Sequence, residues 1–131
     1  GNVGKRVQVS MLCIGSGAVS QKQEFVFLPI EDGVYLIGRS SVCHLQLSEF
    51  GRVSGRHVRI QEQDGDIYAV NLGRHGTTVH DLKNDRDGTM RPAHPGNQLG
   101  ATPLLLQQAG QAVLCLAKGP LVYMRWEIVD D

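Results

Sequence analysis

The chain has 131 residues, 41% of them hydrophobic, which suits one domain with its own core and excludes a disordered chain. Thirteen Lys and Arg residues balance thirteen Asp and Glu residues, and this net charge of zero argues against a general nucleic-acid binder. Sixteen Gly and five Pro residues predict many turns, as in a small all-β fold.

The cysteines bear on the cellular compartment. Cys13, Cys43 and Cys115 are odd in number and widely spaced, which predicts no disulfide framework and favours an intracellular protein, nuclear or cytoplasmic. No stretch approaches the ~20 apolar residues of a membrane span, so no membrane partner is expected. The start shows no signal-peptide pattern, and Gly1-Asn2 is consistent with a piece cut from a longer protein.

In the first half of the chain, alternating or continuous apolar runs predict five strands. They cover residues 6–14, 24–30, 34–37, 57–61 and 67–72. In the fourth run, Val58 and Ile60 are expected on one face, with His57 and Arg59 on the other. The Asp64-Gly65 pair predicts a hairpin turn before the fifth run.

The second half is less regular. The β-branched residues of 77–82 predict a strand. Residues 83–102 hold Gly, Pro, Asn and Asp throughout, so a long loop or insertion with one short strand inside is expected. Apolar runs at 103–107 and 112–117 follow. The last strand is the clearest, because Val122, Met124, Trp126 and Ile128 alternate with polar or aromatic residues.

The pattern as a whole predicts an all-β protein. No window shows a sustained helical period with caps. Short strands separated by turn signals at roughly 8–12-residue spacing indicate a β-sandwich or barrel. Residues 1–131 are therefore expected to form a single domain.

Residues 37–60 carry the chemistry of an anion site. Gly38-Arg39 follows an apolar run, and Ser54-Gly55 enters the next strand. Arg74 and Gly76 lie in the turn after the following hairpin. A phosphate on a side chain carries about −1.5 to −2 charges. Its usual partners are guanidinium groups, hydroxyls and backbone N–H groups, all of which these loops offer.

Three motifs carry a family resemblance. Gly38-Arg39, then Ser54-x-x-His57, then the His75-Gly76-Thr77 turn resembles the G-R, S-x-x-H and N-G-(T/S) pattern of the forkhead-associated (FHA) domain. The resemblance implies an FHA/SMAD-like β-sandwich of two twisted, mainly antiparallel sheets with about eleven strands and binding loops at one end. It also implies a module that binds phosphothreonine-containing proteins or peptides and mediates protein–protein interaction in signalling.

The resemblance also implies roles for individual residues. Arg39 and the Ser54 hydroxyl would bind the phosphate, Gly55 would offer its backbone N–H, and Arg56 would add charge. Arg52, two residues before Ser54, is the candidate for reading an acidic side chain three residues after the phosphothreonine.

Other positions are expected to support the loops or to differ from the family. Gly38, His57 and Gly76 would be structural. His75 stands where the family often has an Asn that bonds the peptide backbone, and Gly55 stands where a polar residue is common. Arg74, in place of Thr or Ser, would add a second guanidinium or turn to solvent.

Other features of the sequence suggest alternative functions. Because Gly55 and His75 differ from the residues common in the family, one alternative is an FHA-like scaffold that binds partners independently of phosphate. Cys43-His44 with His57, His75, His80 and His94 suggests a metal, but no C-x-x-C or H-x-x-x-H spacing is present. Without a G-x-S-x-G, Walker or dinucleotide motif, no enzyme is predicted. The expectation is a monomeric binding domain without metal, cofactor or nucleic acid.

Overall fold

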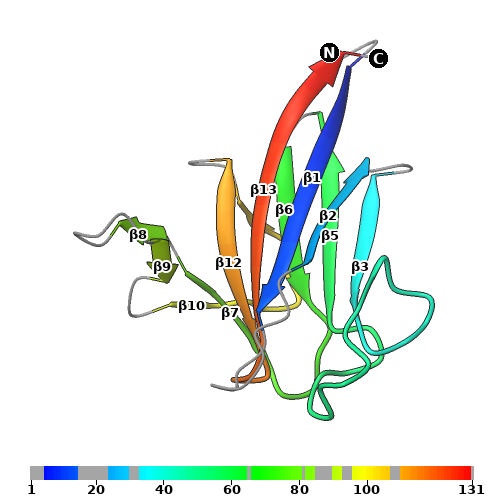
Figure 1. The fold of residues 1–131 in the computed structure, drawn as a ribbon, viewed down its shortest axis with the longest axis vertical. Helices are drawn as coiled ribbons and strands as arrows, with labels where there is room; N and C mark the ends of the chain where they lie inside the picture. The colour runs from blue at the N-terminus through cyan, green and yellow to red at the C-terminus, as the bar shows by residue number, and fades with distance from the viewer. Residues whose placement is uncertain are drawn as a thin grey trace.

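The computed structural model describes residues 5–14, 24–29, 33–64, 66–80, 82–84, 90–92, 96–106 and 110–130. Every helix-or-strand element in these ranges is a β-strand, so the predicted all-β class is confirmed. The strands form two main sheets that pack face to face, plus a separate two-stranded ribbon (Figure 1).

The six-stranded sheet has the order β10-β7-β12-β13-β1-β2, with antiparallel pairing throughout. Its longest pair joins the two ends of the chain, from Lys5 opposite Asp130 to Ile14 opposite Leu121. The members are β1 (Lys5–Ile14), β2 (Glu24–Pro29), β7 (Thr77–His80), β10 (Asn97–Gln98), β12 (Gln111–Leu116) and β13 (Leu121–Asp130).

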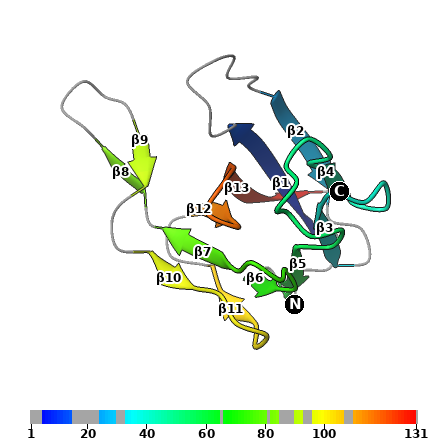
Figure 2. The same ribbon diagram turned by 90° about the horizontal axis from the view of Figure 1, so that it is seen from below.

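The five-stranded sheet has the order β11-β6-β5-β3-β4, and only its β3–β4 pair is parallel. The members are β3 (Val34–Gly38), β4 (Leu45–Gln46), β5 (Val58–Gln63), β6 (Asp66–Asn71) and β11 (Leu104–Leu105). Seen along the strands, the two sheets form two layers (Figure 2). The ribbon of β8 (Leu82–Asn84) and β9 (Met90–Pro92) lies to one side of them, beyond β12 and β7 (Figure 1).

The core lies between the two sheets and follows the predicted alternation. Val122, Met124 and Trp126 of β13 are buried there, in the same apolar cluster as Val58 and Ile60 of β5. Fully burying one such aliphatic side chain stabilises the fold by about 1.5–3 kcal/mol. The alternating residues of β13 therefore fix which face of this strand turns inward.

Some details differ from the sequence expectations. The strand predicted for 77–82 is split, because β7 ends at His80 and β8 begins at Leu82. The segment 83–102, expected to hold one short strand, contains the end of β8 and all of β9 and β10. Within that segment, residues 85–89 and 93–95, which include His94, lie outside the described residues.

The strand expected to start at His57 begins one residue later, because β5 starts at Val58. The sequence predicted His57 on the face opposite Val58 and Ile60, but it did not predict that this side chain is fully buried. A strand alternation cannot predict this, because His57 lies in a loop whose burial depends on another loop.

The loops of interest lie at the end of the sandwich opposite the chain termini (Figure 1). β3 runs into this end and β5 leaves it, while β6 returns to it before β7 begins. Antiparallel pairing therefore brings the connection 39–57 and the turn 72–76 to the same end of the sheet.

Candidate functional site

Ser54 is the residue on which the loops converge. Its carbonyl accepts a hydrogen bond from the Arg39 N–H at 3.0 Å, and its own N–H donates to His57 Nδ1 at 2.9 Å. Its Oγ accepts a bond from the Arg74 N–H at 3.0 Å. Ser54 thus links the end of β3 to the turn between β6 and β7. The hydroxyl hydrogen is not used by this last bond, so it can be donated to a ligand.

His57 supports Ser54 from beneath. Nε2 donates to the Gly76 carbonyl at 2.8 Å while Nδ1 accepts from Ser54, so the ring is neutral with its hydrogen on Nε2. Burial lowers the pKa of His57 below its ordinary value; the Gly76 carbonyl opposes this, and the nearby His75 lowers the pKa further. The buried ring therefore acts as a neutral bridge between two loops.

Two glycines permit the close approach of these loops. A side-chain carbon on Gly38 would overlap the backbone carbonyls of Ser54 and Gly55, and one on Gly73 would overlap the His57 ring. Neither glycine adopts a left-handed φ, so contact rather than backbone conformation excludes a side chain. Gly38 lets the 54–55 segment lie against β3, and Gly73 closes over His57.

Gly55 is held in place by two residues of the loop that follows β3. Its carbonyl accepts bonds from the Ser40 N–H at 2.9 Å and from Cys43 Sγ at 3.1 Å. Burial raises the pKa of the Cys43 thiol; its bond to the Ser40 backbone and the charge of Arg56 act in the opposite direction. The thiol therefore serves as a protonated donor that fixes the loop.

Asn71 fixes the second loop at the end of β6. Its Oδ1 accepts bonds from the Gly73 N–H at 3.0 Å and the Thr77 hydroxyl at 2.9 Å, and its Nδ2 donates to the Gly73 carbonyl at 3.1 Å. The side chain thus spans the whole turn from β6 to β7. The Arg74 N–H is presented to Ser54 by a turn that is itself bonded in place.

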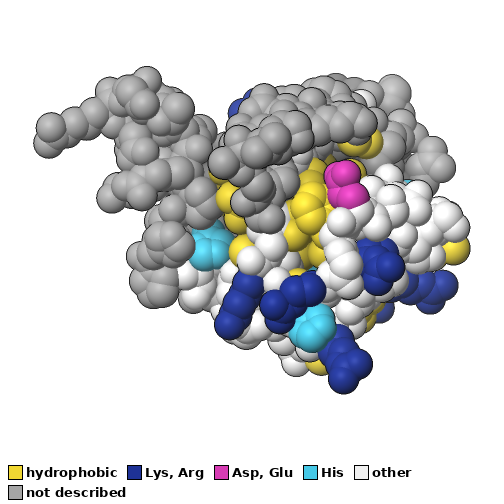
Figure 3. Space-filling model, turned by 60° about the horizontal axis from the view of Figure 1, so that its bottom comes forward, with side chains coloured by type: hydrophobic (Ala, Val, Ile, Leu, Met, Phe, Trp, Pro, Cys, Tyr) yellow, Lys and Arg dark blue, Asp and Glu magenta, His cyan; other side chains and the backbone are white. Residues whose placement is uncertain are grey.

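The surface above these loops is cationic. Arg39, Arg52, Arg56 and Arg74 are all exposed, and so is His75. Figure 3 shows Lys, Arg and His side chains gathered over this end of the molecule with little acidic surface between them. Arg39 Nη1 donates to the Gly51 carbonyl at 3.4 Å, so this guanidinium leans over the loop that carries Arg52. The chain is neutral overall but strongly basic here.

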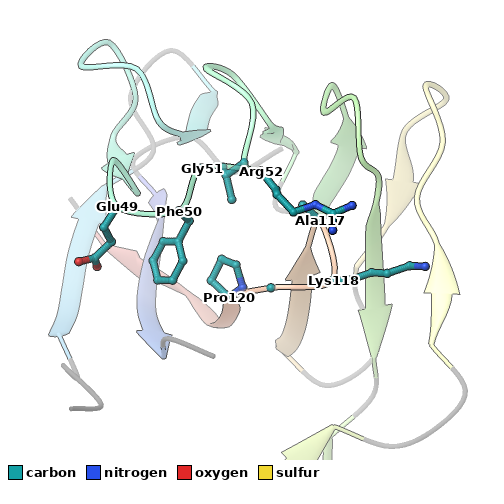
Figure 4. Close-up of a pocket in the computed structure, with 9 residues that line it drawn as sticks. Glu49, Phe50, Gly51, Arg52, Ala117, Lys118 and Pro120 are labelled. Carbon is teal, nitrogen blue, oxygen red and sulfur yellow. The ribbon is translucent and has the colours of Figure 1, made fainter. Parts of the chain in front are cut away.

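A groove with a volume of about 310 Å³ adjoins the basic loops. Its walls are residues 49–53 and the β12–β13 hairpin, residues 117–120 (Figure 4). The rings of Phe50 and Pro120 face each other across it, and Arg52 extends toward the hairpin. The hairpin is fixed to the site, because the Ala117 N–H donates to the Gly76 carbonyl at 2.9 Å.

Comparison with known proteins identifies this arrangement. The family model for the FHA domain matches residues 35–99, which run from within β3 to just past β10. This range contains the Gly38-Arg39, Ser54-x-x-His57 and Gly76-Thr77 motifs. The chain belongs to the FHA domain family. The family inferred from three short motifs is thereby confirmed.

Solved FHA structures share the fold at low sequence identity. An engineered FHA domain with a Myc-pTBD peptide has a TM-score of 0.59 at 15% identity, over 93% of this chain and 93% of that chain. The N-terminal FHA domain of S. cerevisiae Rad53p, in complex with a phosphothreonine peptide, has a TM-score of 0.57 at 15% identity, over 93% of this chain and 94% of that chain.

A longer relative shows the limit of the match. Rad53 residues 1–466, in complex with AMP-PNP, has a TM-score of 0.66 at 14% identity, over 92% of this chain but only 30% of that chain. The chain therefore corresponds to less than a third of that protein. No curated protein sequence matches the chain significantly.

The predicted site residues fall into three groups in this FHA domain. Ser54, Arg39 and Arg74 are joined by direct hydrogen bonds, with Gly38, His57 and Gly76 packed or bonded beneath them. Arg52, Arg56 and His75 lie exposed on the same loops. Gly55 lies beside Ser54, with its carbonyl bonded to the Ser40 N–H and to Cys43 Sγ.

Several supporting residues were missed from the sequence. Asn71, Gly73 and Cys43 belong to no motif, and their roles depend on contacts between loops. An Asn two residues before a Gly at the end of a strand is a usable signal for Asn71, because Asn side chains often bond the backbone two residues on. Nothing in the sequence marks the β12–β13 hairpin as a neighbour of the site, because more than forty residues separate it from Gly76.

Neither a metal cluster nor a membrane-spanning helix is found in the described residues. Across the described ranges, no group of three or more His, Cys, Asp and Glu side chains is arranged to hold a metal ion. No helix within those ranges has the length and apolar character needed to cross a membrane.

Proposed function

We propose that this FHA domain binds phosphothreonine-containing segments of partner proteins and acts as a non-catalytic interaction module in signalling. The observation that carries the proposal is the position of Ser54. Its hydroxyl hydrogen is left for a ligand at the point where the Arg39 and Arg74 loops meet. A phosphate oxygen is a suitable acceptor for this hydrogen, and exposed guanidinium groups complement its charge.

The Rad53p domain supports the choice of ligand, since that relative was solved with a phosphothreonine peptide. In this chain Arg39 would bind the phosphate, with Arg56 and Arg74 adding charge. His75 would contact the peptide backbone, and the backbone N–H of Gly55 would face the same ligand. The loops are fixed by bonds in the absence of ligand, so little backbone movement is expected on binding.

Arg52 is proposed to read an acidic residue that follows the phosphothreonine. It is exposed and lies two residues before Ser54 in the same loop. The three cysteines are free, which is consistent with a nuclear or cytoplasmic protein. We further propose that the domain acts as a monomer without a cofactor.

The test is an oriented phosphothreonine peptide library, probed with the parent domain and with Arg39→Ala and Ser54→Ala. The parent should bind phosphorylated peptides, and each variant should lose binding by at least about tenfold, as removal of a charge-assisted bond implies. Circular dichroism should show that both variants remain folded. Binding by either variant as tight as that of the parent would overturn the site.

A second candidate is interaction independent of phosphate. The five-stranded sheet and its edge expose apolar residues, namely Val34 at 37%, Leu72 at 43% and Leu105 at 43%. Exposed apolar surface of this kind can serve in protein contacts. Matched arrays of phosphorylated and unphosphorylated peptides separate the two candidates, because equal signals on both arrays would favour this second function.

A further inference from the structure

The outer face of the five-stranded sheet is largely apolar. Along each strand, residues alternate between this face and the core, and paired residues share a face. Ile60 and Ala69 are paired and belong to the core, so the intervening rows face outward. The outward rows consist of Val34 and Leu36 of β3, Arg59 and Gln61 of β5, Asp66, Tyr68 and Val70 of β6, and Leu105 of β11.

Arg59 lies at the centre of this face. It is paired with Leu36 on one side and with Val70 on the other. Its Nε is buried and has no hydrogen-bond partner among the described residues. The acid of the outward rows, Asp66, is four positions from Val70 on β6, about 13 Å along the strand. A guanidinium among apolar neighbours calls for a carboxylate from a ligand, which its two terminal nitrogens can bind as a bidentate pair.

The size of the face limits what can cover it. The strands β3, β5, β6 and β11, spaced about 4.8 Å apart, make it roughly 14 Å wide, and the row from Tyr68 to Leu72 makes it about 13 Å long. The resulting area, on the order of 200 Å², is far below the roughly 800 Å² that each partner buries in a stable dimer. A twofold dimer through this face would also bring the central Arg59 near its own copy. A second copy of the chain is therefore a poor occupant.

The occupant must satisfy its own backbone. Within the described strands, the backbone groups of this face are used in pairing between neighbouring strands, so the face offers side chains to a ligand. An α-helix bonds its own N–H and C=O groups and rises about 1.5 Å per residue, so roughly nine residues span the width. An amphipathic helix therefore suits this face, with its apolar stripe against the sheet.

We propose that the outer face of the five-stranded sheet binds a short amphipathic helix of a partner protein, whose apolar stripe carries a Glu or Asp opposite Arg59. Leu72 extends the row of Tyr68 and Val70 toward the phosphate loops, since its N–H donates to the His57 carbonyl at 2.8 Å. Val34, Leu72 and Leu105 supply the exposed apolar contacts. The face adjoins the phosphate loops but uses none of their cations, so the inference goes beyond phosphothreonine recognition and does not require it.

The probe is a phage-displayed library of random, unphosphorylated peptides of about 16 residues, enough for four helical turns. Peptides selected on the parent domain are resynthesised, and their dissociation constants are measured by fluorescence polarisation. The selected sequences should carry apolar residues at helical spacing with a Glu or Asp among them. In ¹⁵N NMR titrations they should shift most strongly the amide signals of Leu36, Gln61, Tyr68 and Leu105.

Two variants of the face and one control test the assignment. Arg59→Gln should weaken the selected peptides at least about fivefold, because it removes the charged donors. Its melting temperature should not fall, because the buried Nε has no partner to lose. Leu105→Ser should weaken the peptides at least about threefold through lost apolar contact. Arg125→Gln is the matched control, because it removes an exposed cation from the outer face of the other sheet, beside the buried Trp126. This control should bind like the parent.

Each outcome decides the matter. Weaker binding by both face variants with an unchanged control would support the inference. Selected peptides that lack an acidic residue, or that bind either face variant as tightly as the parent, would overturn it. Failure to select any peptide, or amide shifts confined to Ser54 and Arg74, would also overturn it. Dimerisation of the parent that Leu105→Ser abolishes, measured by sedimentation, would identify a second copy as the occupant and overturn the helix. Failure of the parent to bind phosphothreonine peptides would instead refute the proposed function and leave this inference intact.

Discussion

Replacing Gly73 with Ala tests whether the buried His57 ring organises the site. The new methyl group would overlap the ring, which is fully buried and bonded at both nitrogens. The ring must move, or the 72–76 turn must lift away from it. Either movement lengthens the bond from Ser54 to Nδ1 or the bond from Nε2 to Gly76.

The expected cost follows from these contacts. Overpacking a tight site costs about 1–3 kcal/mol. Each hydrogen bond that is lost costs about 0.5–1.5 kcal/mol. Restricting the unfolded chain by a Gly-to-Ala change returns about 0.4–1 kcal/mol. Taking the middle of each range with one bond lost, the free energy of unfolding should fall by about 2 kcal/mol, a large fraction of the ~5–15 kcal/mol typical of a domain.

Urea unfolding followed by circular dichroism or Trp126 fluorescence measures this change. A slope of about 1–3 kcal/mol per molar urea predicts a midpoint roughly 1–2 M lower than that of the parent. The matched control is Gly51→Ala, because a side-chain carbon there meets no atom within 4 Å. It should unfold within about 0.5 kcal/mol of the parent. Equal midpoints for Gly73→Ala and the control would refute the role given to His57.

Three further predictions concern the same loops. The lowered pKa of His57 means that the neutral ring stabilises the fold above the unfolded value of about 6.5, and that this stability is lost as the pH falls toward the folded pKa; ¹⁵N NMR of the ring should show titration below 6.5, and titration at or above 6.5 would contradict it. Gly38→Ala should push the 54–55 segment from β3 and weaken phosphopeptide binding at least about tenfold by calorimetry, whereas unchanged affinity would show that the close approach does not matter. Gly55→Asn should leave stability within about 0.5 kcal/mol, since its nearest neighbour is Ser40 Cβ at 3.8 Å, and a new amide bond should raise affinity about threefold; a lower melting temperature would count against the open space.

The strands and the three motif loops were predictable because their signals are local. Alternation in β13 and β5 identified the inward residues, and the Asp64-Gly65 pair marked the hairpin between β5 and β6. The order of the motifs identified the family before any contact between loops was known. Such patterns depend on neighbours within a few residues, which the sequence displays directly.

The contacts that hold the site depend on residues far apart in sequence. The burial of His57 requires Gly73, sixteen positions later, and the fixed position of the Gly76 carbonyl requires Ala117. The pairing of β1 with β13 joins the two ends of the chain, and the groove near Arg52 exists only because that pairing places the β12–β13 hairpin. Sequence periodicity reports only on residues close together in the chain, so it cannot predict these long-range contacts.

Phosphate recognition by these loops can be tested by NMR titration of the ¹⁵N-labelled domain with one phosphothreonine peptide and with the same peptide unphosphorylated. The phosphorylated peptide should shift the amide signals of Ser54, Gly55 and Arg74 most strongly, and the unphosphorylated peptide should leave them in place. Equal shifts with both peptides, or shifts confined to Val34 and Leu105 on the five-stranded sheet, would contradict phosphate recognition at these loops.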